Sequence, residues 1–155
     1  MTTELKRELS DFAEALKSTW GDDLVSVVLF GSQAAGTATE ESDVDLLIVK
    51  KGFPASRLAR RAAMKPVYGR IPSELQDRAS TILLTPDEAE DTKPYYLDMT
   101  VDCEILYDRD GFFEGILNRL RNRLKELGSR RVFDPDGYPY WILKPDARLG
   151  EEITL

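Results

Sequence analysis

The sequence contains no histidine, and Cys103 is the only cysteine among its 155 residues. Without histidine, the chain cannot build a serine–histidine triad, a histidine-dependent acid–base pair or a histidine-ligated zinc site. A single cysteine cannot form a disulfide within the chain. Its position before an apolar stretch predicts a small core residue rather than a nucleophile. What remains open is chemistry that carboxylates and metal ions perform.

Long apolar runs are also missing, as are fixed-period repeats and glycine motifs of the P-loop or dinucleotide-binding type. No stretch approaches the roughly 18 apolar residues that span a bilayer, and the charged amino terminus does not resemble a signal peptide. We therefore expect a cytoplasmic protein with no membrane partner. A length of 155 residues and an apolar fraction of 42% fit a single globular domain, and the net charge of −7 argues against nonspecific DNA binding.

A glycine-bounded turn followed by two carboxylates is the most informative pattern in the chain. The β-branched, apolar run at 24–30 predicts a buried strand, which Gly31–Gly36 ends. A second strand is predicted at 43–49. Because alternate side chains of a strand share a face, Asp43 and Asp45 should point the same way, about 7 Å apart along the backbone.

Two carboxylates on one face suit a hard divalent cation such as Mg²⁺, which is typically held by one or two carboxylates and by substrate phosphates. In the turn, Gly31 and Ser32 leave backbone N–H groups uncovered for a phosphate, and the Ser32 hydroxyl can donate to it. Each feature alone could be a solvated strand or an ordinary turn. The apolar run at 46–49 predicts a central strand, however, where unpaired charges are costly. The combination favours metal-assisted phosphoryl or nucleotidyl transfer.

These residues also carry a family resemblance. The segments Gly31-Ser32-Gln33-Ala34-Ala35-Gly36 and Ser42-Asp43-Val44-Asp45-Leu46-Leu47 resemble the G-S-x-A-x-G…S-D-x-D-L-L signature of the minimal nucleotidyltransferases in the DNA polymerase β superfamily. The resemblance covers roughly residues 4–110. It implies an α/β (α+β) fold, with a small mixed sheet flanked by helices.

The resemblance implies an enzyme that uses Mg²⁺ or Mn²⁺ and transfers a nucleoside monophosphate from a nucleoside triphosphate. AMP is the favoured group, and the acceptor is a hydroxyl of a protein, an RNA or a small molecule. Asp43 and Asp45 would be the catalytic metal ligands. Three further residues, Gly31, Ser32 and Gly36, would contact the nucleotide. Ser42 could touch the ligand too, although a role in capping the turn is the favoured interpretation.

The chain departs from the family pattern at two places. Arginines are common at the third and fifth positions of the glycine motif, where this chain has Gln33 and Ala35. Active members also carry a third acidic residue on a later strand, in a pattern like V-D-L-V-T-P, and Ile82 stands in that position. The identity of a substitute third carboxylate stays open among Asp77, Asp87, Asp98 and Asp102.

Three functions are therefore compatible with the sequence. The first is the transferase itself. The second, implied by the resemblance, is an antitoxin that silences a helical HEPN ribonuclease by binding or by nucleotide modification. The third is a nucleotide-binding module without catalysis, which Ile82 and the missing arginines would explain. A homo-oligomer is compatible with each of these.

Periodicity and turn residues predict the remaining elements. A first helix is expected at 3–20, ended by Gly21, and a second from Pro54 to Met64, stopped by Pro66. Further helices are expected at 94–100 and from a cap at Asp110 to Gly128. Strands are expected at 79–85, at 103–107 and near Trp141 and Ile153. We expect a nucleotidyltransferase core at 1–110. Residues 111–155 should form a carboxy-terminal helix and an extended tail packed on that core.

Basic residues cluster directly after the second predicted strand. The segment 50–70 contains no acidic residue and holds Lys50, Lys51, Arg57, Arg60, Arg61, Lys65 and Arg70. The cluster could hold a triphosphate, an RNA end or an acidic partner. The solvated face of a helix is the slightly favoured alternative.

Overall fold

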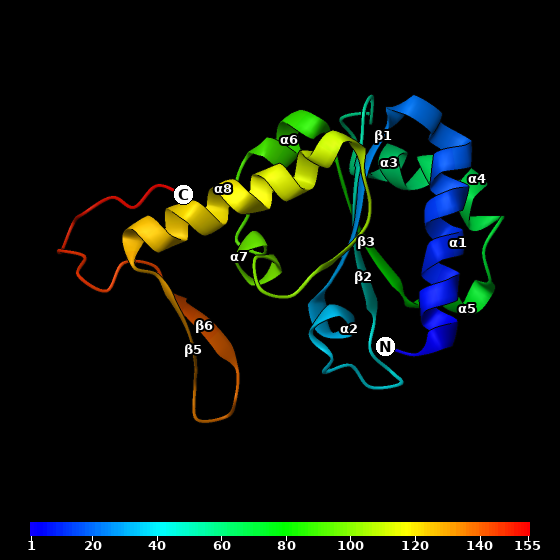
Figure 1. Cartoon of the computed structure of the whole chain (residues 1–155). Coiled ribbons are helices and arrows are strands. Elements are labelled where there is room, and N and C mark those ends of the chain that lie inside the picture. The colour runs from blue at the N-terminus through cyan, green and yellow to red at the C-terminus, as the bar shows by residue number, and fades with distance from the viewer.

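The computed structural model describes residues 1–155 and centres on a four-stranded sheet in the order β3-β2-β1-β4. The strands are β1 (Leu24–Phe30), β2 (Val44–Lys50), β3 (Ala79–Leu84) and β4 (Glu104–Asp108). β1 is antiparallel to β2 and to β4, whereas β2 and β3 are parallel. The small mixed sheet and the interior position of β2 confirm the sequence predictions. Figure 1 shows the sheet between two groups of helices.

One face of the sheet is covered by α1 (Thr3–Trp20), whose amino terminus is capped by the Thr2 hydroxyl and which ends at Gly21. Leu9, Phe12 and Leu16 of α1 are buried against side chains of β1 and β2. Three short helices complete this side: α3 (Arg57–Ala63), α4 (Lys65–Tyr68) and α5 (Ser73–Arg78). The helix predicted from Pro54 begins only after Ser56, which caps it, and Pro66 lies at the start of α4 instead of ending a helix.

The opposite face is covered by α6 (Pro86–Glu90), α7 (Tyr96–Met99) and α8 (Phe112–Leu127). Tyr96 and Phe113 meet edge to face within this second core cluster. α8 does not use Asp110 as its cap, contrary to the sequence prediction. Asp110 has a φ of +53°, and the carboxylate of Asp108 accepts the N–H groups of Phe113 and Glu114 at 2.9 Å instead.

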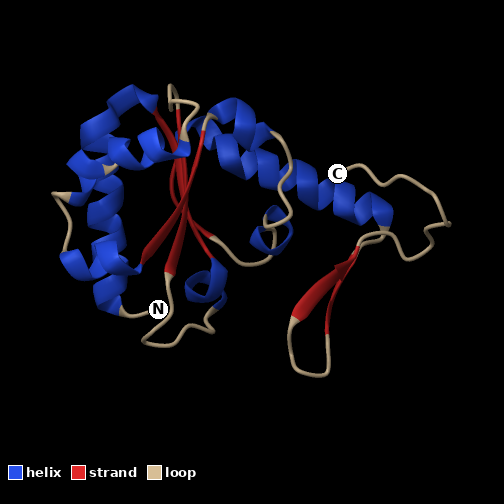
Figure 2. Ribbon diagram, turned by 180° about the vertical axis from the view of Figure 1, so that it is seen from behind, coloured by secondary structure: helices blue, strands red, loops and turns tan.

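A hairpin of β5 (Arg130–Phe133) and β6 (Pro139–Ile142) follows α8. Figures 1 and 2 show that it projects from the end of α8, away from the main sheet. The strand near Trp141 is confirmed, β5 was not predicted, and the strand expected near Ile153 does not form. The indole N–H of Trp141 donates to Asp98 at 3.0 Å, which ties the hairpin to α7.

Two single-turn 3₁₀ helices, Gly21–Asp23 and Arg109–Gly111, connect the major elements. None of the helices has the length and apolar character that crossing a lipid bilayer requires. Cys103 is partly buried against the second core cluster, and burial raises the pKa of its thiol. The core role predicted for this residue is consistent with that position.

Candidate active site

The two predicted carboxylates lie where β2 begins. Asp43 is exposed and directly precedes the strand, whereas Asp45 is its second residue and is partly buried. Val44 and Leu46, on the other side of the strand, are fully buried. Burial, and then the negative charge of Asp43, raise the pKa of Asp45. The two carboxylates therefore lie close enough to repel each other.

The glycine motif before them is a short helix rather than a simple turn. α2 (Gly31–Ala35) begins directly after β1 and contacts both β1 and β2. Gly31 has a φ of +71°, and a Cβ atom at this position would overlap the Oδ2 atom of Asp45 and lie 3.1 Å from its Cγ. Only glycine fits here, and its absence of a side chain brings the start of α2 against the Asp45 carboxylate.

The other residues of the motif fall into two groups. Ser32 follows Gly31 at the start of α2, whereas Gly36 ends the helix in a left-handed conformation with a φ of +78°. Ser42 acts within its own turn, since its hydroxyl accepts the N–H of Thr39 at 2.8 Å. This contact matches the capping role favoured for Ser42 from the sequence.

The residues that replace the family arginines point in different directions. Gln33 is buried, with 6% of its surface exposed, and its amide nitrogen has no hydrogen-bond partner in the chain. Ala35 is exposed and too short to reach a ligand. α2 therefore offers backbone groups and the Ser32 hydroxyl, but no cationic side chain, to a phosphate.

The register of the parallel strands locates the missing third carboxylate. Asp45 pairs with Ser80, and Leu47 pairs with Ile82, so Ile82 lies one pleat beyond the Asp45 level on the same face. The chain contains no group of three or more acidic, histidine or cysteine side chains arranged to hold a metal ion. The predicted metal ligands are therefore Asp43 and Asp45, and Ile82 lies where the family resemblance predicts a third acid.

The four proposed substitutes for that carboxylate separate in the structure. Asp77 lines a cavity of about 410 Å³ together with Asp43. Asp87 lies on the exposed first turn of α6. Asp98 and Asp102 are held by the hairpin, through Trp141 and Arg131 respectively. Of the four, Asp77 shares this cavity with a predicted metal ligand.

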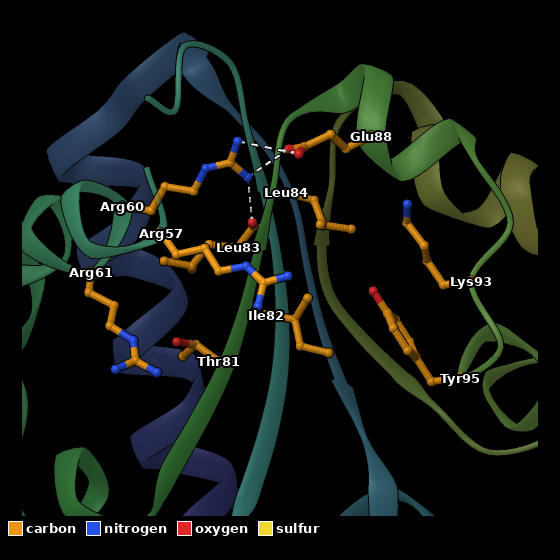
Figure 3. Close-up of a pocket in the computed structure, with 10 residues that line it drawn as sticks. All are labelled: Arg57, Arg60, Arg61, Thr81, Ile82, Leu83, Leu84, Glu88, Lys93 and Tyr95. Carbon is orange, nitrogen blue, oxygen red and sulfur yellow. Dashed lines mark hydrogen bonds and ion pairs between the residues drawn. The ribbon is translucent and has the colours of Figure 1, made fainter. Parts of the chain in front are cut away.

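Part of the basic cluster lines a second cavity, of about 510 Å³, which follows the outer edge of β3. Figure 3 shows Arg57 extending from α3 across the strand and Arg61 beside it near Thr81, with Lys93 and Tyr95 on the opposite wall. The cluster is therefore not only the solvated face of a helix. Sequence reasoning missed Lys93 and Tyr95, because no motif links them to α3.

Arg60 has a different role from its two neighbours. Its guanidinium is buried and donates to the carbonyls of Pro54 and Leu83, at 2.6 and 2.9 Å, and to the Glu88 carboxylate at 2.6 Å. The hydrogen bonds from Arg60, followed by those from Thr85, lower the pKa of Glu88 to about 2. This ion pair joins α3 to α6 across the edge of β3, and no sequence signal predicted it.

Comparison with known proteins gives consistent matches. A family model described as a nucleotidyltransferase domain matches residues 9–132. A relative from Methanocaldococcus jannaschii, named "putative protein adenylyltransferase", is 34% identical over 125 residues, which cover 79% of this chain and 85% of the relative.

Two solved structures show weaker similarity. A toxin–antitoxin structure with AMP-PNP has a TM-score of 0.49 at 15% identity, over 77% of this chain and 92% of the other. A tri-AMPylated Shewanella oneidensis HEPN toxin in complex with an MNT antitoxin has a TM-score of 0.46 at 12% identity, over 79% and 92%.

Proposed function

The chain belongs to the nucleotidyltransferase domain family, and we propose that it transfers AMP from ATP to a hydroxyl group of a protein. The observation that carries this proposal is the contact between the start of α2 and the Asp45 carboxylate. A backbone segment that would bind phosphate thus lies beside a carboxylate that would bind metal. The name of the 34% identical relative supports a protein acceptor and an adenylyl donor.

Asp43 and Asp45 would hold Mg²⁺, and the observed residues fit that ion. Both ligands supply oxygen, and Mg²⁺ is commonly held by one or two carboxylates plus substrate phosphates. Burial, and then repulsion from Asp43, raise the pKa of Asp45, and a cation between the two carboxylates would relieve that repulsion. Bound there, the metal would supply charge neutralisation at the reacting phosphate.

The other residues bind and orient the triphosphate. The backbone N–H groups of Gly31 and Ser32 and the Ser32 hydroxyl would hold phosphate oxygens, whereas Gly36 would fix the end of α2. In the reaction, the acceptor oxygen forms a bond to the α-phosphorus and the bond to the bridging oxygen of pyrophosphate breaks. The hydroxyl proton passes to solvent or to a carboxylate such as Asp77, which shares a cavity with Asp43.

The test is label transfer from α-³²P-ATP in the presence of Mg²⁺ and a cell extract that supplies acceptors. We expect a labelled protein band with wild type and none with Asp43→Asn/Asp45→Asn. A matched control, Asp11→Asn/Asp136→Asn, removes two charges at exposed positions away from the site and should label like wild type. Equal labelling by wild type and the Asp43→Asn/Asp45→Asn variant would contradict the proposal, and a labelled RNA band would change the acceptor class.

A second function is favoured by one specific observation. Ile82 replaces the third carboxylate and no other ligand group completes the site, which suits a module that binds nucleotide without turnover. Calorimetry separates the two functions: ATP binding that is lost in Asp43→Asn/Asp45→Asn, without label transfer to any acceptor, would identify the module.

The HEPN-type partner and a homo-oligomer also remain predictions. A HEPN protein encoded beside this chain that co-purifies with it would support the first. Light scattering of the isolated chain would test the second.

A further inference from the structure

Two adjoining cavities lie along β3, and the smaller one begins at Asp43. The smaller cavity is lined by Asp43, Ser80 and Thr81, and it shares Arg61 and Thr81 with the larger one. From Ser80, at the level of Asp45, to Leu84 the groove follows the strand for about 13 Å, at about 3.3 Å per residue. We call these two adjoining cavities the β3 groove.

The position of the β3 groove corresponds to the acceptor side of the proposed reaction. In phosphoryl transfer the attacking and leaving oxygens lie roughly in line, on opposite sides of the phosphorus. α2, which would hold the leaving pyrophosphate, follows β1 and contacts both β1 and β2. β3 lies on the other side of β2. An attacking hydroxyl must therefore approach over β3.

The β3 groove has a cationic wall and an apolar floor. Ile82 and Leu84 lie along the floor, and Tyr95 faces them from the opposite wall in Figure 3. Arg57, Arg61 and Lys93 line the same space, and none of these three side chains has a carboxylate within ion-pair distance. Three unpaired cations around an apolar floor indicate a ligand that is both anionic and apolar.

We propose that the β3 groove binds the acceptor protein through an extended acidic segment of about four residues. An apolar side chain of this segment packs on Ile82, and its carboxylates meet Arg57, Arg61 and Lys93. This inference rests on the proposed function, because it assigns the acceptor of the same reaction. It also assigns a role to Ile82. This residue stands where the family pattern has an acid, and it would form part of the surface that contacts the acceptor.

A protein segment fits the groove better than RNA. Asp43 and Asp77 line the catalytic end of the groove, where a polynucleotide would place further phosphates. A peptide can place a neutral hydroxyl-bearing residue there and keep its carboxylates beside Arg57, Arg61 and Lys93. Simple extension of the sheet by the bound segment is restricted. Arg60 already donates to the carbonyl of Leu83, so side chains rather than a full strand ladder hold the segment.

The first experiment measures binding directly, with fluorescein-labelled poly-glutamate in a fluorescence anisotropy titration at low salt. The variant Arg57→Gln/Arg61→Gln/Lys93→Gln should bind about tenfold more weakly than wild type, because exposed ion pairs contribute modestly and are screened by salt. The control Arg7→Gln/Lys125→Gln/Arg130→Gln removes the same charge at three exposed positions outside the groove. It should bind within about twofold of wild type.

The second experiment measures transfer from α-³²P-ATP to a poly(Glu,Tyr) copolymer, whose tyrosines supply hydroxyl groups. The groove variant should raise the KM for the copolymer about tenfold and leave the KM for ATP unchanged. Equal loss in the groove variant and the control, or no loss in either, would overturn the groove. Tighter, groove-dependent binding of an oligouridylate than of poly-glutamate would overturn it in favour of RNA.

The two proposals fail separately. Absence of label transfer by wild type to the copolymer and to every protein in a cell extract overturns the proposed function, and with it the assignment of an acceptor. Transfer that the three glutamine substitutions leave unchanged overturns the groove alone. A loss that is confined to copolymer transfer and poly-glutamate binding supports the groove.

Discussion

The two sides of β2 are built by different means. On the α2 side, the backbone makes the site: Gly31 adopts a positive φ and has no room for a side chain beside Asp45. On the β3 side, side chains from α3, β3 and the segment before α7 surround an open groove. The first side tolerates only glycine at position 31, whereas substitutions on the second side can change which ligand it binds. Specificity for an acceptor is therefore expected on the β3 side.

The largest effect should come from breaking the α2 side with Gly31→Ala. The new Cβ would overlap Oδ2 of Asp45 and would hold alanine at a φ of +71°. Displacing the carboxylate by about 1 Å is expected to reduce label transfer about 100-fold.

The control for this substitution is Gly52→Ala, at a position with a similar φ of +78° and no atom within 4 Å of the added Cβ. Both variants should lose about 1 kcal/mol of stability to backbone strain, measured by urea unfolding. Only Gly31→Ala should lose transfer. Equal transfer by the two variants would show that the contact with Asp45 is unimportant.

The substitution Ile82→Asp tests the β3 side. It places an acid one pleat beyond the level of Asp45. A third carboxylate should raise the affinity for Mg²⁺ about tenfold in a calorimetric titration. The same charge would remove the apolar floor of the β3 groove and weaken poly-glutamate binding.

Leu84→Asp is the matched control for Ile82→Asp, since Leu84 lies on the same face of β3, opposite Val49. It introduces the same charge farther from Asp45 and should leave the Mg²⁺ affinity at the wild-type value. A gain of similar size in both variants would mean that general negative charge, rather than position, sets the affinity.

These two comparisons show which parts of the site could be read from the sequence. The strand–glycine–carboxylate arrangement, the central position of β2 and helix α1 follow from local rules, namely alternation, helical periodicity and glycine at a chain reversal. The groove does not follow from such rules. Arg57, Ile82 and Tyr95 come from three separate segments. The parallel β2–β3 pairing, the packing of α3 and the stacking of Tyr95 on Phe30 bring them together.

Two of the errors in the prediction have the same origin. Asp108 rather than Asp110 caps α8, because the chain turns through a left-handed Asp110 before the helix begins. β5 was missed because its pairing with β6 depends on the turn between them and on the contacts of Arg131 and Trp141 with α7. Each error concerns a contact between residues whose proximity the local pattern does not show.

The wall of the β3 groove should depend on the Arg60–Glu88 ion pair. Glu88→Gln leaves a guanidinium whose side chain is only 10% exposed without its carboxylate, at a cost of about 1 kcal/mol at pH 7. Because the folded state holds the pKa of Glu88 at about 2, below its ordinary value of 4.5, this stability is present above pH 4.5 and lost as the pH falls toward 2.

Glu90→Gln provides the control on the same helix. Glu90 pairs with Arg119 at 2.7 Å, but both side chains are at least half exposed, so its removal should cost less than about 0.5 kcal/mol. Urea unfolding of the two variants and wild type between pH 2 and pH 7 checks both values. A Glu88→Gln cost that does not shrink with acid would contradict the assigned ion pair.

The smallest expected effect is a change in the Tm on substitution of Asp45. At this residue, metal binding and the stability of the metal-free fold have opposite requirements. Burial and Asp43 raise the pKa of Asp45, so without metal its ionised form destabilises the folded state as the pH rises above the ordinary value of 3.8. Asp45→Asn in EDTA should therefore raise the Tm at pH 7 by about 1–2 °C, because solvent screens much of the repulsion. Below pH 3.8 the difference should vanish.

Magnesium should reverse that order. A ligand that binds only the folded state stabilises it in proportion to the logarithm of its concentration over Kd, and the asparagine variant should lose this gain. The Tm of wild type should then lie above that of Asp45→Asn in millimolar Mg²⁺ and below it in EDTA. The control Asp136→Asn, at an exposed position in the hairpin turn, should have the Tm of wild type under both conditions. A variant that remains the more stable protein in Mg²⁺ would show that Asp45 does not hold the metal. A crossing of the two curves would identify Asp45 as a residue kept for binding at the expense of stability.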